Sequence, residues 1–257
     1  MVEITKCRIC NGSVNKIFTS KVLNKHLVTY YKCNVCGYIC TEEPYWLNEA
    51  YKNPINNCDT GILMRNNYLA KRASIIFYFL FDKHRKYLDY SGGYGIATRM
   101  FRDIGFDGYW DDPMTTNIFA KGFEYKKSMK IEAITAFECF EHFVDPVTEL
   151  KKMLKISNNI VFSTEILPVT VPDPKSWWYY GFEHGQHVSF YSDETLNRLA
   201  KMYGLNYYNL LGVGLITKKK FSYIDIKMTT RLTELLFSYV KFNMKSLTIS
   251  DMEKINE

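Results

Sequence analysis

The segment Leu88–Ala97 constrains the fold of this chain more than any other part of the sequence. It reads Leu-Asp-Tyr-Ser-Gly-Gly-Tyr-Gly-Ile-Ala, so a short apolar strand runs into a glycine-rich turn and a helix begins at once. Such a turn lets a ligand approach the backbone closely at the carboxyl end of the first strand of a parallel sheet. The segment therefore predicts an α/β fold with a ligand site at this turn.

The sequence around this turn alternates short apolar runs with helical patterns, which is typical of a parallel α/β sheet. The expected strands are Tyr87–Tyr90, Gly108–Trp110, Ala133–Ala136 and Ile160–Ser163. The expected helices are Ile96–Ile104, Thr115–Lys121, Val147–Lys155 and Asp193–Tyr203, the last with an N-terminal cap at Ser192. An earlier helix is expected to start at Asp59–Gly61, and one or two amphipathic helices are expected from Lys218 onward.

The first 40 residues carry two Cys-x2-Cys pairs, Cys7 with Cys10 and Cys33 with Cys36, separated by 22 residues. This spacing is typical of a tetrahedral zinc–thiolate site in which two tight knuckles are joined by a hairpin. Closed four-cysteine sites are normally structural, so we expect structural Zn²⁺ here; the alternative is four buried or free cysteines.

Small details of the two pairs favour the zinc interpretation. Asn11-Gly12 and Gly37 follow the second cysteine of each pair, where a backbone turning back toward a metal favours positive φ. The remaining cysteines, Cys40, Cys58 and Cys139, fit no pair and are expected to be ordinary residues.

Bulk composition bounds the class of protein. With 257 residues, 47% hydrophobic and 23% charged, the chain can hold one medium-sized domain and a small accessory module. A net charge of +6 permits an anionic ligand without requiring one. The sequence shows no signal peptide, and its longest apolar stretch, Ile75–Phe81, is too short to span a bilayer, so a cytoplasmic protein is expected.

A second acidic element, Asp111-Asp112-Pro113, lies some 17 residues past Gly95 and after the next expected strand. A carboxylate there is placed to accept hydrogen bonds from ribose hydroxyls. Together with the turn, it resembles the first two motifs of class I methyltransferases. The rival reading of a glycine-rich turn is a dinucleotide dehydrogenase.

The resemblance implies S-adenosylmethionine as cofactor. The residues that it places at the methionine moiety are Asp89, Ser91, Gly92, Gly93 and Gly95, and the residue that it places at the ribose is Asp112. The sequence departs from the family at Ser91, where the family has its first glycine. The stretch Gly122–Lys130 also lacks the aspartate that commonly contacts the adenine amine.

The run Ala133–Pro146 decides against the dehydrogenase, because it resembles the fourth-strand region of small-molecule and sugar methyltransferases. There a Glu-His pair is followed by an Asp-Pro turn and a helix, as at Glu141-His142 and Asp145-Pro146. The resemblance covers residues 86–210, and a cysteine-rich knuckle also precedes methyltransferases of polysaccharide gene clusters.

The fold that this resemblance implies is α/β, a Rossmann-like seven-stranded methyltransferase fold with a small zinc-ribbon-like module and C-terminal helices. The expected divisions are a zinc-binding module over 1–43, a helical linker over 44–85, the methyltransferase domain over 86–217 and a helical extension over 218–257.

The element Glu138-x-x-Glu141-His142 lies just beyond the fourth strand, where the ligand crevice of such a sheet opens. On a helical turn these three side chains share one face, and their oxygen and nitrogen atoms suit Mg²⁺, Mn²⁺ or Zn²⁺. The same pattern occurs in metal-dependent O-methyltransferases of the ubiquinone pathway and of small-RNA 3′ ends. In the RNA group a further histidine completes the site, and His187 matches it best, with His184 as second choice.

Two other interpretations of this element stay open. Glu141-His142 acts as a general base while His187 orients substrate without metal, or the pair only caps the next helix and supports the cofactor loop. The aromatic segment Pro168–Phe182 forms a lid over the crevice or packs on the zinc module.

The function expected from these features is transfer of a methyl group to a hydroxyl of a sugar, either nucleotide-linked or within a surface glycan. An RNA or other small-molecule O-methyltransferase is the alternative, although the sequence shows no long basic stripe with interleaved aromatics. A non-catalytic scaffold with a degenerate methyltransferase fold is the third hypothesis.

Overall fold

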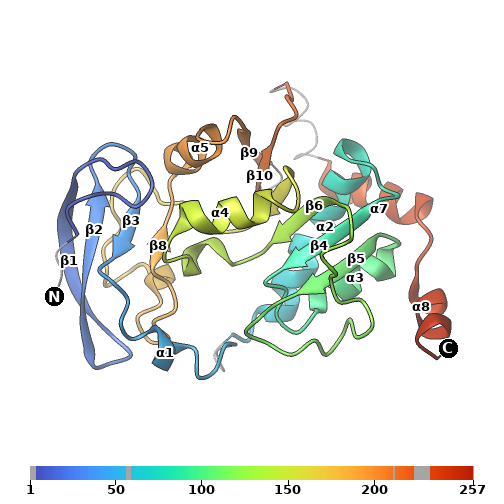
Figure 1. Ribbon diagram of the computed structural model, residues 1–257, viewed down its shortest axis with the longest axis horizontal. Helices are drawn as coiled ribbons and strands as arrows, with labels where there is room; N and C mark the ends of the chain where they lie inside the picture. Colours follow the sequence, from blue (N-terminus) through green and yellow to red (C-terminus); the bar gives the residue numbers. More distant parts are fainter. Residues whose placement is uncertain (1–3, 56–58, 211, 223–231, 257) are drawn as a thin grey trace.

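The computed structural model describes residues 4–55, 59–210, 212–222 and 232–256. Within these residues the strands form two sheets, one at the N-terminal end of the molecule and one at its centre (Figure 1). No helix in the described ranges is long and apolar enough to cross a membrane.

The central sheet has the strand order β5-β4-β6-β7-β10-β9. Its strands are β4 (Lys86–Tyr90), β5 (Asp107–Asp111), β6 (Ile131–Ala136), β7 (Ile160–Phe162), β9 (Asn206–Leu210) and β10 (Val213–Thr217). The pairs among β5, β4, β6 and β7 are parallel, whereas β10 is antiparallel to both of its neighbours. After β4 the chain passes first to β5 on one side and then to β6 on the other. At such a change of direction in the strand order, a crevice opens between the carboxyl ends of the two strands, here β4 and β6.

The described residues supply six of the seven strands that the resemblance implies. On the outer side of β5, Trp110 forms an isolated parallel bridge with Glu124. Two backbone bonds make it: Trp110 N–H donates to Phe123 O at 2.9 Å, and Tyr125 N–H donates to Trp110 O at 2.8 Å. The seventh position of the sheet is therefore reduced to a single bridge.

Helices cover both faces of the central sheet. One face packs against α2 (Ile62–Leu80), α3 (Ile96–Ile104) and α7 (Thr233–Asn243), and the other against α4 (Pro146–Leu154) and α5 (Asp193–Lys201). Side chains alternate along β4 as in any strand: Tyr87 belongs to the first core and Leu88 to the second. The helix expected near residue 60 is α2, and it shares its core with the sheet.

Local sequence signals account for the helix ends. Gly95, with φ 85°, precedes α3, and Gly105, with φ 120°, ends it. Asp145 caps α4 by accepting a hydrogen bond from Thr148 N–H, and Ser192 caps α5 in a capping box, as predicted.

The helix predicted over Thr115–Lys121 is wrong, since that segment is a series of bends and turns. The Asn117 side chain accepts from Ala120 N–H and donates to both Ala120 O and Glu124 Oε1. In addition, Ile118 and Phe119 N–H both donate to Tyr94 O. Local side-chain bonds thus replace the helical ones.

The N-terminal sheet has the order β1-β2-β3-β8. Its first three strands are β1 (Val14–Val22), β2 (His26–Cys33) and β3 (Ile39–Thr41), and a short helix α1 (Leu47–Ala50) follows. The fourth strand, β8 (Ser189–Phe190), comes from the far end of the chain and pairs antiparallel with β3. The cysteine-bearing sheet is therefore built from two distant parts of the sequence.

After α7 the chain ends in α8 (Thr248–Asn256), which lies beside α3 and β5 (Figure 1). The two helices α7 and α8 agree with the expectation for the C-terminal part, but residues 223–231 of that part lie outside the described residues, as does Cys58.

Candidate active site

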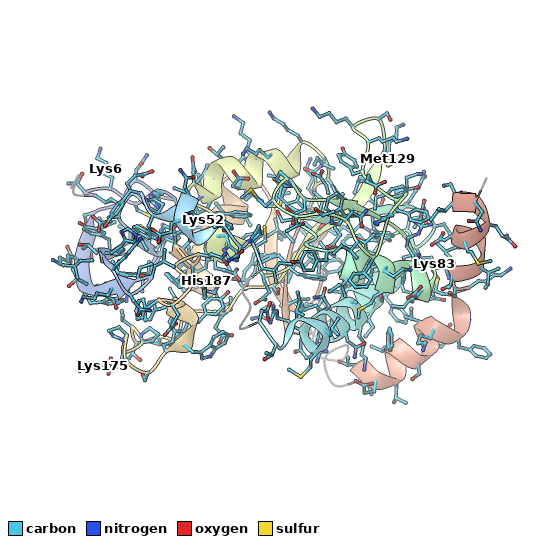
Figure 2. All side chains as sticks on the ribbon, turned by 90° about the horizontal axis from the view of Figure 1, so that it is seen from below. Lys6, Lys52, Lys83, Met129, Lys175 and His187 are labelled. Carbon is cyan, nitrogen blue, oxygen red and sulfur yellow. The ribbon has the colours of Figure 1, made fainter. Side chains whose placement is uncertain are left out.

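A cavity of about 950 Å³ lies at the carboxyl ends of β4 and β6, where the central sheet faces the N-terminal sheet. In Figure 2, His187 lies between the N-terminal sheet and the elements of the central sheet. The sequence-predicted cofactor and reacting residues line this cavity, except Gly95: they are Asp89, Ser91, Gly92, Gly93, Asp112, Glu138, Glu141, His142 and His187.

The glycine-rich turn forms one end of the cavity. Ser91 has φ 54°, in the left-handed region that favours glycine, which explains why the family has a glycine there. A Cβ on Gly92 would lie 2.8 Å from both Asp89 Oδ2 and Trp110 Cδ1. By contrast, a Cβ on Gly93 would meet nothing nearer than Ile55 Cδ1 at 3.8 Å, so this glycine borders open space.

Two aspartates hold the turn. Asp89 is fully buried and accepts hydrogen bonds from the hydroxyls of Thr98 at 3.0 Å and Thr135 at 2.8 Å. Burial raises the pKa of Asp89 to about 6. Asp112 Oδ2 accepts from Gly93 N–H at 2.9 Å, and its Oδ1 accepts from Met114 N–H at 2.7 Å. Asp112 thus fixes the backbone of the turn while lining the cavity.

The opposite end carries three groups that converge. One ligand atom each of Glu141, His142 and His187 lies within 4.8 Å of the other two. Glu141 is fully buried on the 3₁₀ turn η1 (Phe140–His142), and neither of its carboxylate oxygens makes a close hydrogen bond among the described residues, although the hydroxyls of Tyr179 and Thr164 lie near enough to favour its charged form. Burial raises the pKa of Glu141 to about 7.

Backbone carbonyls orient both histidines. His142 Nδ1 lies 3.1 Å from Gln186 O, and His187 Nδ1 lies 2.6 Å from Tyr179 O. A carbonyl only accepts, so both Nδ1 atoms carry the proton and both Nε2 atoms are left to bind a metal or to accept a proton. Burial lowers the pKa of both imidazoles, which favours their neutral form.

Glu138 stands outside this group. The sequence predicts that it shares a helical face with Glu141 and His142, but the turn begins only at Phe140. Glu138 has φ 48° and accepts a hydrogen bond from Ser163 Oγ at 2.5 Å, and its Oε2 lies 3.8 Å from Arg65 Nε. Burial raises the pKa of Glu138 to about 7. It is a neighbour of the cluster rather than a member.

The structure adds three residues that the sequence did not single out. The Tyr51 hydroxyl lies 2.9 Å from His142 Nδ1, and Arg65 forms a bidentate ion pair with Asp59 inside the cavity. The Gln186 amide donates to the carbonyls of Ala50, Asn53 and Pro54, and so holds this segment against the histidines. No motif marks these residues. Tyr51 and Gln186 act through partners far away in sequence, and the Arg65–Asp59 pair belongs to no recognisable pattern.

Some aromatic residues of the segment Pro168–Phe182 pack on the N-terminal sheet, and another lines the cavity. Trp177, Tyr179 and Tyr180 pack on the N-terminal sheet, whereas Trp178 is 75% exposed and lines the cavity. His184 is the second choice, after His187, for the histidine that completes the metal site. Its ring centroid lies 4.6 Å from that of His187, but His184 is not part of the converging group.

The four cysteines of the N-terminal pairs also converge. Their sulfurs lie within 4.8 Å of one another, with contacts of 3.7 Å for Cys7–Cys36, 3.4 Å for Cys10–Cys33 and 3.6 Å for Cys10–Cys36. A tetrahedron of thiolates with Zn–S bonds of about 2.3 Å has edges of about 3.8 Å. Asn11, with φ 56°, and Gly37, with φ 75°, take the positive φ expected after each pair. The donor set and geometry fit structural zinc.

The sequence model of the family described as "Methyltransferase domain" matches residues 64–210, which is 147 of the 257 residues. The chain belongs to this methyltransferase family. The match begins within α2 and extends through β9, so it covers the turn, Asp112 and the cluster of Glu141, His142 and His187. None of the curated proteins matches this methyltransferase in sequence.

Several solved structures are similar to this methyltransferase at low identity. TnmH is 13% identical with a TM-score of 0.44, over 66% of this chain and 60% of TnmH. CalO1, described as a methyltransferase in calicheamicin biosynthesis in its SAH-bound form, is 13% identical with a TM-score of 0.45, over 62% of this chain and 54% of CalO1. The plantazolicin methyltransferase BpumL, in complex with SAH, is 14% identical with a TM-score of 0.42, over 77% of this chain and 84% of BpumL.

Proposed function

We propose that this methyltransferase transfers a methyl group from S-adenosylmethionine to a hydroxyl of a sugar, assisted by a divalent metal ion at Glu141, His142 and His187. One observation carries the proposal. A single cavity has the glycine-rich turn, with Asp112 bonded to Gly93, at one end and the carboxylate–histidine cluster at the other. A donor and an acceptor bound at the two ends would meet within it.

The turn fits the cofactor. Gly93 offers backbone beside open space, and Asp112 keeps free lone pairs on the two oxygens that hold the turn. Asp112 would accept hydrogen bonds from the ribose hydroxyls, and the backbone of Ser91–Gly93 would lie against the methionine moiety. When bound, S-adenosylmethionine supplies the methyl group on a sulfonium centre, which makes it open to attack by oxygen.

The cluster fits a divalent cation. A buried carboxylate that makes no close hydrogen bond among the described residues is costly unless a cation or a proton compensates it. Two neutral imidazoles whose Nδ1 atoms are held by carbonyls present Nε2 in the way typical of metal-binding histidines. Three protein ligands leave positions open for an acceptor hydroxyl, whose pKa a bound cation would lower.

The cluster also provides for the proton. As the new O–CH₃ bond forms and the C–S bond breaks, the acceptor hydroxyl must lose its proton. With the metal bound, both Nε2 atoms are its ligands, and the neighbouring Glu138 carboxylate, which lines the same cavity and has a pKa raised to about 7, accepts this proton. Without a metal, the neutral imidazole of His142 or of His187 accepts it at Nε2. Tyr51 and Gln186 hold the His142 ring in place.

The charges of the cavity favour a sugar that enters without phosphate. Eight carboxylates line it against one guanidinium, that of Arg65, which Asp59 already pairs. Such a lining repels phosphate groups and disfavours RNA or the diphosphate of a nucleotide sugar, despite the net charge of +6. The exposed Trp178 indole offers a flat apolar surface on which a sugar ring can pack.

The test follows transfer of labelled methyl groups from S-adenosylmethionine to three matched acceptors: a methyl glycoside, the corresponding amino-sugar glycoside and the nucleotide-linked sugar. We expect transfer to the two glycosides to exceed transfer to the nucleotide-linked sugar at least tenfold. Asp112→Ala is the control, because loss of hydrogen bonds to a charged group weakens S-adenosylhomocysteine binding by about 10- to 100-fold. No binding of S-adenosylhomocysteine at millimolar concentration would instead support the scaffold hypothesis.

A further inference from the structure

We propose that the four-cysteine site positions the acceptor end of the cavity. Zinc held by these cysteines fixes the N-terminal sheet, and this sheet fixes the loop of His187 and the turn of Glu141 and His142. The identity of these three residues as the reacting groups rests on the proposed function; the mechanical connection itself rests only on contacts in the structure.

The first connection runs from the second cysteine pair to the strand after His187. Cys36 O accepts hydrogen bonds from Thr195 Oγ at 2.7 Å and from Ser192 Oγ at 3.4 Å. The next residues of the same arm form β3, whose Ile39 and Cys40 pair with Phe190 and Ser189 of β8. His187 lies two residues before β8, so the cysteine-bearing arm sets where this histidine stands.

The second connection runs through side chains to the turn of Glu141. Tyr38 lies two residues after Cys36, and its hydroxyl is 2.5 Å from Ser189 Oγ. The Ser189 hydroxyl in turn donates to Phe143 O at 2.5 Å. Because Ser189 gives its proton to the carbonyl, Tyr38 is the donor in the first of these bonds. One relay thus joins the cysteine arm, β8 and the residue after His142.

The third connection is made by backbone alone. Val188 N–H donates to Glu141 O at 2.8 Å, and Thr41 N–H, at the end of β3, donates to Val188 O at 3.1 Å. Val188 is fully buried and lies directly after His187. The amides of Val188 and Thr41 therefore report on the very contacts that join the sheet to the reacting cluster.

Burial makes these connections stiff. Cys7, Cys33, Cys36 and Tyr38 belong to the same buried cluster as Phe140 of the reacting turn. Tyr191, which follows β8 directly, packs against Tyr38 and donates its hydroxyl proton to Phe140 O at 2.8 Å. Close-packed interiors transmit a displacement instead of absorbing it.

The cofactor end is held differently. Asp89 bonds to Thr98 of α3 and Thr135 of β6, and Gly93 bonds to Asp112 and Trp110 at the end of β5. All of these residues belong to the central sheet and its helices. Loss of the cysteine site should therefore loosen the acceptor end and leave the cofactor end in place.

Hydrogen–deuterium exchange on the full chain, with zinc bound and after its removal, tests this without any acceptor. We expect the amides of Val188 and Thr41 to exchange at least about tenfold faster after zinc removal, whereas those of β4 change little. Unchanged exchange at Val188 and Thr41, or equal acceleration across β4, would overturn the proposal. Neither result depends on methyl transfer, so failure of the proposed function is distinguishable.

Tyr38→Phe tests the relay with zinc still bound, and Tyr30→Phe is its matched control. Tyr30 is a buried tyrosine of the same sheet that takes no part in the relay. We expect Tyr38→Phe to lower kcat severalfold and to accelerate exchange at Val188, with the zinc content and the KM for S-adenosylmethionine unchanged. Equal behaviour of the two variants would contradict a positioning role for Tyr38.

Discussion

Asp89 shows, at the scale of one residue, how the proposed cofactor site opposes stability. Its carboxylate is fully buried between two threonine hydroxyls, and burial raises its pKa to about 6 from an unfolded value of about 3.9. The native state therefore holds this proton more tightly than the unfolded state does. The contribution of Asp89 to the free energy of unfolding is greatest below pH 4 and is lost as the pH rises through about 6.

Asp89→Asn should remove this loss. We expect the free energy of unfolding of the variant to rise relative to that of the native protein as the pH rises from 4 to 7. The gain is up to about 3 kcal/mol, because each unit of pKa shift corresponds to roughly 1.4 kcal/mol. Urea unfolding at pH 4.5 and pH 7.5 measures the difference. The same variant should bind S-adenosylhomocysteine more weakly; a stability difference that is constant with pH would contradict the assignment of the shift to Asp89.

Single residues also show what the sequence can predict. Asp89 lies near the end of β4, and the other motif residues follow strand ends: Ser91, Gly93, Asp112, Glu141 and His142. The structure places all of them around one cavity. Tyr51 and Gln186 carry no such signal, because their importance comes from contacts with His142 and with the segment 50–54 across long sequence separations. Glu138 is displaced because a 3₁₀ turn starts two residues later than the helical pattern predicts.

Secondary-structure elements follow their sequence patterns where the local and tertiary preferences agree. The helix Ile96–Ile104 has the predicted bounds, since glycines flank it and an apolar face meets the sheet. The segment Thr115–Lys121 has helical spacing too, but Asn117 ties its backbone into turns. The two-residue strand β8 was not predictable, because only its partner β3, some 150 residues earlier, makes it a strand.

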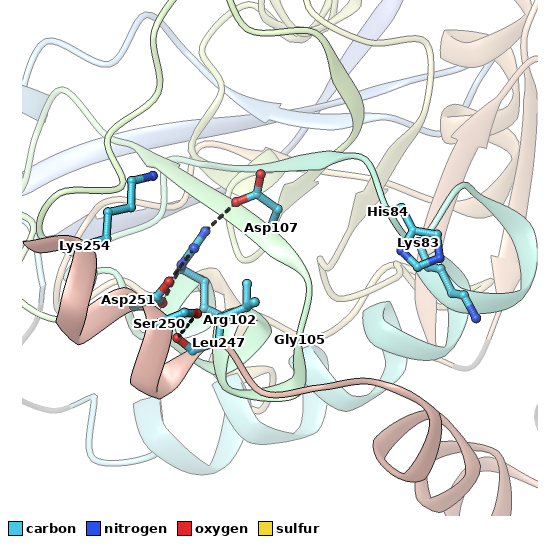
Figure 3. Close-up of a pocket in the computed structure, with 9 residues that line it drawn as sticks. All are labelled: Lys83, His84, Arg102, Gly105, Asp107, Leu247, Ser250, Asp251 and Lys254. Atoms are coloured by element: carbon cyan, nitrogen blue, oxygen red, sulfur yellow. Dashed lines mark hydrogen bonds and ion pairs between the residues drawn. The ribbon is translucent and has the colours of Figure 1, made fainter.

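A buried ion pair holds the helix α8 on the molecule, together with Arg99 Nη2, which lies 2.9 Å from Asp251 Oδ2, and with Leu247 N–H, which donates to Arg102 O at 3.0 Å. Arg102 of α3 donates to both oxygens of Asp251 at 2.6 and 2.7 Å and to Asp107 at 2.7 Å (Figure 3). The side chains of Arg102 and Asp251 are each 5% exposed, at a hollow of about 300 Å³ that shares no residue with the large cavity.

Asp251→Ala should therefore lower the free energy of unfolding by about 3 kcal/mol, because it leaves the buried guanidinium with one partner fewer. Denaturant unfolding measures this loss, and the exposed Glu253→Ala is the control. We expect S-adenosylhomocysteine binding to be unchanged, since α8 is remote from the cavity. A parallel loss of binding would show that α8 supports the cofactor site.

At the scale of the whole molecule, the proposed reacting site lies where the central sheet and the N-terminal sheet meet. The central sheet supplies the glycine-rich turn and the segment of Glu141, and the loop of His187 leads into the sheet that carries the cysteines. The sequence predicts both parts, but as neighbours along the chain. That β8 crosses into the cysteine-bearing sheet, and so joins the two, depends on packing between distant segments and is seen only in the folded molecule.

The two candidate metal sites of this arrangement differ in how firmly they would hold their ions. Four thiolates close one site, whereas two imidazoles and one carboxylate leave the other open to solvent and acceptor. Brief treatment with EDTA should therefore empty the Glu141 site and leave the zinc of the four cysteines, as measured by metal analysis. We expect methyl transfer to fall at least tenfold and to return on addition of Mg²⁺, Mn²⁺ or Zn²⁺, with S-adenosylhomocysteine binding unchanged.

Glu141→Gln keeps the size of the side chain but removes its charge, so it should abolish the response to added metal. Full activity after EDTA, with only the cysteine zinc retained, would contradict metal assistance. In that case the proton acceptor would be Nε2 of His142 or His187 acting alone, as their neutral, carbonyl-anchored rings allow. The metal analysis and the transfer assay together thus separate the two mechanisms that one geometry permits.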